Sequence, residues 1–391
     1  MPIPLSYNFR NLRERRVTSL MTALGVALAV AVLVSVLALV QGLKTAFEAT
    51  GDPRDLLVLR KGSTAELVST ITRTNYQDIR QHAGIARSAE GPLASLEMVT
   101  IINIGDESTG RDMNFNLRGV SNIAFAMRPE LHIIRGRRFM PGRREVIVGK
   151  SIPARFPSIA DPGGVLQFGR GGGGSEWKIV GVFEAGNTMF NGEVWGDLNQ
   201  VSADYNRSEY LSSLLIRTEP GMLEALARSL EDDPRFTVSA EPEQSYYASQ
   251  TSASAPVEFM GTLVALIMAV GSAFAAMNTM FAAVARRSAE IGILRMLGFT
   301  RGAILGSFLV ESLVLAMLGA VAGCLLTLPL NNVNTDIGSY NTYSTLAFNF
   351  HVSWRVMGWG MAFGLFIGGL GGLLPAVRAS RMEIIAAVKR R

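Results

Sequence analysis

Four long stretches of this sequence are almost free of charge, and they constrain the fold more than any other feature. They cover residues 17–43, 259–285, 304–330 and 356–377, and the single charged residue within them is Glu311. A helix rises about 1.5 Å per residue, so each stretch can cross the roughly 30 Å hydrocarbon core of a bilayer. We therefore predict four transmembrane helices.

The first stretch follows basic residues, as a signal peptide would. Its apolar part is longer than that of a signal peptide. The residues after it, Lys44 to Phe47, also offer no cleavage site between small residues. We expect a retained membrane anchor.

The distribution of Lys and Arg predicts how the helices are oriented. Basic residues gather in 1–16, 286–303 and 378–391, whereas residues 331–354 contain neither Lys nor Arg. Because cytoplasmic loops carry the basic excess, we expect both termini and the 286–303 segment on the cytoplasmic side of the membrane. Residues 331–355 would then form a short outer loop, and residues 44–258 a large outer domain.

The net charge supports this arrangement. The chain has 37 Lys and Arg against 32 Asp and Glu, a net charge of +5. Residues 44–258 hold 23 basic and 27 acidic residues, so the other residues alone carry +9. The basic excess therefore lies at the predicted cytoplasmic membrane face, which argues against a nucleic-acid partner.

The outer domain mixes strand and helix signals. Short β-type runs occur at 56–59, 98–102, 146–148, 178–183 and 213–216. Thr74 with Gln77 has the pattern of a capping box, and Pro220 can open a helix over Gly221–Leu230. Because strands and helices do not alternate strictly, we predict an α+β domain of two lobes.

No residue set predicts catalysis, a metal site or a nucleotide site. The histidines His82, His132 and His351 lack the spacing of metal ligands. The glycine run 171–174 is not followed by the Lys and Ser/Thr of a phosphate loop, so we interpret it as a flexible hairpin tip. Cys324 lies in the third stretch and is interpreted as a small apolar filler. We expect no cofactor in this chain and no enzyme activity.

Two charged features admit more than one interpretation. One is a cluster that is either a solvated turn or a docking patch for an acidic partner. It consists of Arg135, Arg137, Arg138, Arg143 and Arg144. The other is Glu311, which is either functional within the membrane or neutralised by snorkelling or by pairing with Arg295 or Arg301.

Small residues recur in three of the four stretches at a spacing that places them on one helix face. Such residues let helix backbones approach closely, so we expect a tight bundle or a dimer rather than a wide pore. They are Gly360, Gly364, Gly368 and Gly372 in the fourth stretch, the pairs Gly302/Gly306 and Gly319/Gly323 around the third, and Ala23, Ala27, Ala31 and Ser35 in the first.

Three segments carry a resemblance to a known family. They are Asn8-Phe9-Arg10-Asn11-Leu12-Arg13, Glu290-Ile291-Gly292-Ile293-Leu294-Arg295-Met296-Leu297-Gly298, and Pro375-Ala376-Val377-Arg378-Ala379-Ser380-Arg381. With the order of one span, a large outer domain and three spans, the chain resembles the MacB/FtsX-type ABC-transporter permeases. The resemblance covers the whole chain.

The resemblance implies that the 286–303 segment docks on a separate ABC ATPase, which would bind ATP and Mg. Stalk helices at Gln41–Ala49 and Tyr246–Phe259 would pass the motion to the outer domain, a mechanism called mechanotransmission. Ile291, Leu294 and Leu297 would form an apolar anchor, and Gly298 would end the helix. The residues implied in ATPase coupling are Arg287, Glu290, Ile291, Gly292, Leu294, Arg295, Leu297, Gly298 and Arg301.

The function implied is export or extraction of a lipid, lipoprotein, peptide or small amphiphile. A second copy of the chain is the expected dimer partner, and a periplasmic adaptor protein and an outer-membrane channel are further expected partners. The alternative is a mechanotransmitting regulator or sensor that acts on a periplasmic partner such as a cell-wall hydrolase. A membrane-bound enzyme has the least support.

Overall fold

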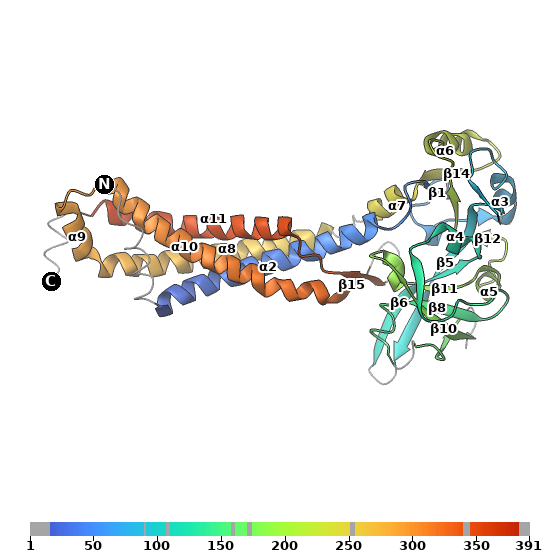
Figure 1. Cartoon of the computed structure of the whole chain (residues 1–391), viewed down its shortest axis with the longest axis horizontal. Coiled ribbons are helices and arrows are strands. Elements are labelled where there is room, and N and C mark those ends of the chain that lie inside the picture. Colours follow the sequence, from blue (N-terminus) through green and yellow to red (C-terminus); the bar gives the residue numbers. More distant parts are fainter. Residues whose placement is uncertain are drawn as a thin grey trace. The chain divides into compact units, whose positions relative to one another are not determined.

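The computed structural model describes residues 16–89, 91–106, 110–157, 161–169, 174–250, 255–338 and 345–382 (Figure 1). The described residues within 1–41, 255–333 and 350–391 form a helical unit, and those within 42–254 and 334–349 form an inserted domain. The basic terminal segments 1–15 and 383–391 and the glycines 171–173, on which sequence predictions rest, lie outside the described residues.

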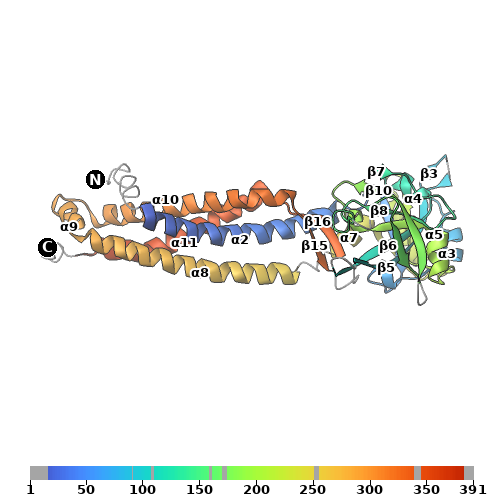
Figure 2. The same ribbon diagram turned by 90° about the horizontal axis from the view of Figure 1, so that it is seen from below.

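Four long apolar helices build the helical unit and lie side by side in both views (Figures 1 and 2). They are α2 (Arg16–Glu48), α8 (Ala255–Arg286), α10 (Arg301–Thr327) and α11 (Trp354–Ser380). Each is long and apolar enough to cross a membrane, as predicted. Two begin at a side-chain cap, since Thr300 accepts the Ala303 N–H at 3.2 Å and Ser353 accepts the Val356 N–H at 3.3 Å.

Glycines let α10 and α11 approach their neighbours closely. A Cβ atom added at Gly319 or Gly323 would lie 2.5 Å from the carbonyl oxygen of Ala23 or Ala27 on α2. Cβ atoms at Gly360, Gly364, Gly368 and Gly372 of α11 would likewise overlap Val34, Ala320, Ala316 and Ser312. A Cβ atom added at Gly302 or Gly306 would meet nothing within 4 Å, so this pair does not pack closely within the chain, and its packing in a dimer stays a prediction.

Ten described strands of the inserted domain form one sheet in the order β14-β1-β13-β5-β6-β11-β8-β10-β7, with β9 paired to β10. Most neighbours are antiparallel, but β11 runs parallel to β6 and β10 runs parallel to β8. The bounds are β1 Asp55–Arg60, β5 Ala94–Asp106, β6 Arg111–Val120, β7 Leu131–Gly136, β8 Glu145–Gly149, β9 Val165–Phe168, β10 Ser175–Ala185, β11 Val194–Asp197, β13 Ser213–Arg217 and β14 Val238–Pro242. The five predicted β-type runs lie in β1, β5, β8, β10 and β13 and are confirmed.

The long strand β5 joins the two halves of this sheet. Its first residues, 94–97, pair with β13, and its later residues, 98–106, pair with β6. The two lobes expected from the sequence therefore share one sheet.

Helices and short strand pairs complete the inserted domain. They are η1 Glu66–Val68, β2 Ile71–Thr72, α3 Arg73–Ile79, β3 Arg87–Ser88, β4 Gly91–Pro92, α4 Ile123–Met127, η2 Met189–Gly192, α5 Leu198–Asp204, β12 Tyr210–Leu211, α6 Leu223–Asp232 and α7 Glu243–Ser249.

Two helices of this domain begin about half a turn away from their predicted starts. Thr72, not Thr74, caps α3 by accepting the Asn75 N–H at 3.1 Å. Helix α6 begins after Gly221, whose φ of 81° is left-handed and incompatible with a helix.

Apolar and aromatic side chains form the core of the inserted domain. Trp177 and Trp195 are fully buried. Phe168 stacks on Trp177 with ring centres 5.0 Å apart, and Phe190 meets Trp195 edge-on at 5.6 Å. The chain's one cysteine, Cys324, is buried in α10, so packing rather than a disulfide stabilises this domain.

The segment expected to form a short outer loop, residues 331–355, contributes a hairpin. After η4 (Leu328–Asn332), strand β15 (Asn334–Gly338) pairs antiparallel with β16 (Thr345–Asn349). Strand β16 lies against β6 and η2, and the hairpin belongs to the inserted domain.

The structure describes the first expected stalk completely and the second only in part. Residues 41–48 continue α2 without interruption. In the second stalk, α7 ends at Ser249 and α8 begins at Ala255, and residues 251–254 lie outside the described part of the chain.

Candidate functional site

The 286–303 segment begins at a joint between two helices. Helix α9 (Ser288–Met296) follows α8 after Arg287 alone, which has φ −101° and ψ 14°. The Arg287 N–H contacts the carbonyl oxygens of Ala283 and Val284, both at 3.2 Å, and its own carbonyl accepts the Ile291 N–H at 2.9 Å. The backbone of Arg287 therefore belongs to both helices.

The side chain of Arg287 joins two carboxylates. Its Nη1 donates to Oε2 of Glu311 on α10 at 3.0 Å, and its Nε donates to Oε2 of Glu290 on α9 at 3.3 Å. The guanidinium also lies 5.1 Å from the ring centre of Phe308. Arg287 and Glu311 are 6% and 4% exposed. Glu311 is thus paired with Arg287, a partner that sequence reasoning did not consider.

Helix α9 ends where the sequence predicts. Gly298 has a φ of 91°. Its N–H donates to the carbonyl of Arg295, and the Phe299 N–H donates to the carbonyl of Leu294, both at 3.2 Å. These two bonds define a Schellman motif, in which glycine is the favoured residue at the left-handed position.

The exposed apolar residues at α9 share only Leu297 with the predicted anchor. Ile291 is 2% exposed and belongs to a buried cluster with Phe308. Ile293, Met296 and Leu297 are instead 51%, 57% and 71% exposed. Their spacing of three and four residues places them on one face, which we call the α9 apolar face.

The other residues expected in ATPase coupling divide by exposure. Gly292 is buried, Leu294 and Arg295 are half-buried, and Glu290 and Arg301 are exposed. The structure thus brings Arg287 and Ile291 into the bundle and leaves the α9 apolar face beside exposed charges. An exposed apolar surface rimmed by charge is suited to binding another protein.

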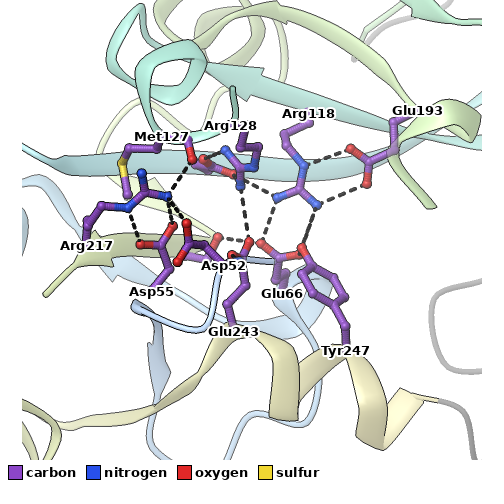
Figure 3. A network of polar contacts seen from close by, with 12 residues as sticks. Asp52, Asp55, Glu66, Arg118, Met127, Arg128, Glu193, Arg217, Glu243 and Tyr247 are labelled. Atoms are coloured by element: carbon purple, nitrogen blue, oxygen red, sulfur yellow. Dashed lines mark hydrogen bonds and ion pairs between the residues drawn. The ribbon is translucent and has the colours of Figure 1, made fainter. Parts of the chain in front are cut away.

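A second group of charges is buried in the inserted domain (Figure 3). Arg118 on β6 makes two-point contacts with Glu66, at 2.9 and 3.0 Å, and with Glu193, at 2.8 and 3.0 Å. It also donates to Glu97 at 2.8 Å. One fully buried guanidinium therefore links η1, β5, β6 and the start of β11.

Arg128 and Arg217 extend this charge network. Arg128 donates to Glu97 at 2.7 and 3.1 Å, and Arg217 donates to Asp55 at 2.7 and 2.8 Å. Arg128 also lies 3.7 Å from Oε1 of Glu243, the first residue of α7. The network therefore reaches from the sheet to α7 (Figure 3).

Carboxylates outnumber arginines in this network, and burial raises the pKa of the least compensated of them. Burial raises the pKa of Glu243 to about 8, and the charge of Arg128 offsets this only in part. Burial also raises the pKa of Asp55 despite its bond to Arg217. For Glu97 burial acts in the same direction, but Arg128 and Arg118 overcome it and hold its pKa below the ordinary value.

The arginine cluster at 135–144 is largely neutralised within the domain. Arg135 lies 2.7 Å from Asp161, Arg137 lies 2.7 Å from Glu145, and Arg144 lies 2.8 Å from Asp204. Arg143 is also within 3.9 Å of Glu145. These pairs within the domain favour the solvated turn over a docking patch for an acidic partner.

The search for a metal site among the described residues gives no candidate. Among those residues, no three His, Cys, Asp or Glu side chains are placed to hold a metal ion. His132 and His351 are exposed, and His82 shares a hydrogen bond with Ser229 at 3.2 Å.

Two family models match this chain in succession. A model described as the MacB-like periplasmic core domain matches residues 19–233. A model described as the FtsX-like permease C-terminal region matches residues 262–384.

Curated relatives match the chain over parts of their length. The chain is 34% identical over 131 residues to the uncharacterized ABC transporter permease YknZ of Bacillus subtilis, which covers 33% of this chain and 30% of that protein. It is 25% identical over 232 residues to the macrolide export ATP-binding/permease protein MacB of Hahella chejuensis, covering 56% and 34%. It is 22% identical over 377 residues to MacB of Shewanella sp. W3-18-1, covering 86% and 55%. The chain thus spans between a third and about half of these relatives.

Solved structures give weaker matches. The extracellular domain of YknZ matches with a TM-score of 0.37 and 16% identity, over 48% of this chain and 99% of that one. The periplasmic region of MacB from Actinobacillus actinomycetemcomitans matches with a TM-score of 0.38 and 9% identity, over 50% and 92%.

Proposed function

The chain belongs to the MacB/FtsX-type family of ABC-transporter permeases, and on that premise we propose that it couples ATP hydrolysis in a partner ATPase to motions of its inserted domain. The ATP and Mg would be bound by the ATPase. The observation that carries the proposal is the α9 apolar face, formed by Ile293, Met296 and Leu297 and left exposed by the bundle.

The α9 apolar face has the chemistry of a docking surface. Apolar side chains that are more than half exposed gain free energy when a partner covers them, and the exposed Glu290 and Arg301 beside them can add specificity. A Schellman motif fixes the end of α9, so the face is held on a helix of defined length. The proposed ATPase would dock here from the cytoplasmic side of the inner membrane, where both termini would also lie.

The end of α2 offers a route for motion into the inserted domain. Helix α2 is continuous from Arg16 to Glu48, and Phe47 and Thr50 at its end are buried. The Thr50 Oγ1 accepts the Met189 N–H at 3.1 Å and donates to the Ala46 carbonyl at 2.7 Å. A displacement of this helix end would therefore act directly on the domain core, which supports mechanotransmission.

The proposed cargo is a lipid, lipoprotein, peptide or small amphiphile, exported or extracted from the inner membrane or periplasm. The proposed assembly contains two copies of the permease, with an adaptor protein and an outer-membrane channel as further partners. Helix α8 offers a surface for the second copy, because Leu263, Ile267, Val270 and Phe274 are exposed along it.

Co-purification tests the proposal. The full chain, tagged and extracted from native membranes, should recover an ABC ATPase in a fixed ratio. Replacing Leu297 by Asp should lose the ATPase, whereas replacing the exposed Val165 of the inserted domain by Asp should not. A homogeneous complex without any nucleotide-binding subunit would refute the proposal.

A further inference from the structure

The joint between α8 and α9 is built around a single buried cation. Arg287 has backbone hydrogen bonds to α8 on one side and to Ile291 of α9 on the other. Its side chain reaches a third helix, since Nη1 lies 3.0 Å from Oε2 of Glu311 on α10. One residue therefore contacts three helices, α8, α9 and α10.

The contacts of Arg287 differ in strength. The pair with Glu311 is almost fully buried, and Phe308 covers the guanidinium from one side at 5.1 Å. The Glu290 side chain is 57% exposed and its contact is longer, at 3.3 Å. Solvent screens an exposed pair and not a buried one, so the bond to Glu311 dominates.

Breaking the buried pair would have a local consequence. Removing either partner leaves the other with less charge compensation beside the apolar side chains of Ile291, Ile304 and Phe308. A Glu311 that has lost Arg287 can also bind a proton. In either case the link from the α8–α9 joint to α10 is lost, so α9 can rotate away from α10 or admit water. Both changes would loosen α9 while leaving the α9 apolar face chemically intact.

We infer that Arg287 and Glu311 are positioning residues that make α9 move as one body with α8 and α10. This inference rests on the proposed function, because it assigns the step after docking: the ATPase displaces α9, and the buried pair passes the displacement to the helices. Arg287 then acts inside the bundle and does not belong to the docking surface on which the family resemblance placed it.

The experiment uses the full chain in lipid nanodiscs, with the substitution Cys324→Ser. Spin labels at Ala289→Cys on α9 and Leu318→Cys on α10 report the distribution of distances between the two helices. In the same preparations, recovery of the ATPase and its stimulated rate of hydrolysis are measured. The variants are E311Q, R287M and the exchange R287E/E311R, and the matched control is R286M at the exposed neighbouring arginine.

The expected result separates docking from coupling. E311Q and R287M should broaden the distance distribution and reduce stimulated hydrolysis by about tenfold, while ATPase recovery stays at the wild-type level. The exchange should restore a narrow distribution and part of the stimulation, which a loss of general stability would not allow. R286M should behave as the wild type.

Two results would overturn the inference. One is a narrow distribution with full stimulation in E311Q. The other is loss of the ATPase in every variant of the pair together with an unchanged distance distribution, which would make Arg287 a docking residue. If the wild type itself recovers no ATPase, the proposed function fails, and the distance measurement on the permease alone still decides whether the pair fixes α9. If E311Q does not fold, the distance distributions of R287M and of the exchange R287E/E311R are compared instead, and a narrow distribution in both would overturn the inference.

Discussion

The guanidinium of Arg118 holds the carboxylate of Glu193 at two points, with Nε to Oε2 at 2.8 Å and Nη2 to Oε1 at 3.0 Å. The same guanidinium binds Glu66 and Glu97, so a single cation contacts three buried carboxylates, of which Glu97 is also bound by Arg128. Burial makes such a network dependent on every member, because a charge that loses its partner cannot be hydrated.

Replacing Arg118 by Met should therefore destabilise the inserted domain strongly. Loss of one partner from a buried ion pair costs about 3–5 kcal/mol, and here three carboxylates lose a partner. The thermal unfolding midpoint of the full chain measures the effect. Arg228→Met is the matched control, since its pair with Glu224 is exposed, and its midpoint should not change. Equal midpoints for the two variants would show that the network does not stabilise the domain.

The raised pKa of Glu243 predicts a dependence of stability on pH. Its ordinary value is 4.5 and its folded value about 8, so the folded chain binds the proton more tightly than the unfolded chain. The stabilisation that the folded chain gains from this tighter proton binding is complete below pH 4.5 and is lost as the pH rises to about 8. The Glu243→Gln variant stays neutral, so it should be more stable than the wild type at pH 9. Its free energy of unfolding should also decline less as the pH rises. A decline of the same size in both proteins would contradict this assignment.

Two adjacent glycines of α11 test the packing of the bundle. A Cβ at Gly368 would overlap Ala316, whereas a Cβ at Gly369 meets nothing within 4 Å. Gly368→Val should cost about 1–3 kcal/mol of stability through overpacking, and Gly369→Val should cost much less. Melting temperatures in one detergent give the comparison, and a larger loss for Gly369→Val would show that this face is covered by another protein.

Gly298 should be required for coupling rather than for insertion. Its φ of 91° disfavours any side chain with a Cβ, so Gly298→Val would disturb the end of α9 and move the α9 apolar face. We expect lower ATPase stimulation with normal membrane insertion. Gly302→Val is the control, because that glycine is helical and has open space around it.

Local patterns in the sequence predicted most of the architecture. Uncharged runs identified four helices, and β-type runs identified five strands, because each signal is carried by neighbouring residues. The hairpin at β15 and β16 was missed, since its polar residues lack a strand pattern and it is stabilised by elements distant in sequence, β6 and η2.

The candidate sites were predicted less well, for a physical reason. Arg287 and Arg295 look alike in a basic segment, and only the position of Glu311 on α10, 24 residues later, buries one of them. Helical periodicity places apolar residues on faces but does not say which face is covered, so Ile291 was assigned to the surface in place of Ile293. Arg118 lies 75 residues from Glu193, and such a distance leaves no local signal.

Crosslinking from the α9 apolar face tests whether an ABC ATPase docks there. Leu297→Cys, combined with Cys324→Ser, places one thiol on the α9 apolar face. With a short bifunctional reagent in native membranes, we predict a covalent product with an ABC ATPase, and no such product for Val165→Cys on the inserted domain. A product that contains no nucleotide-binding subunit, or equal ATPase crosslinking from both positions, would contradict it.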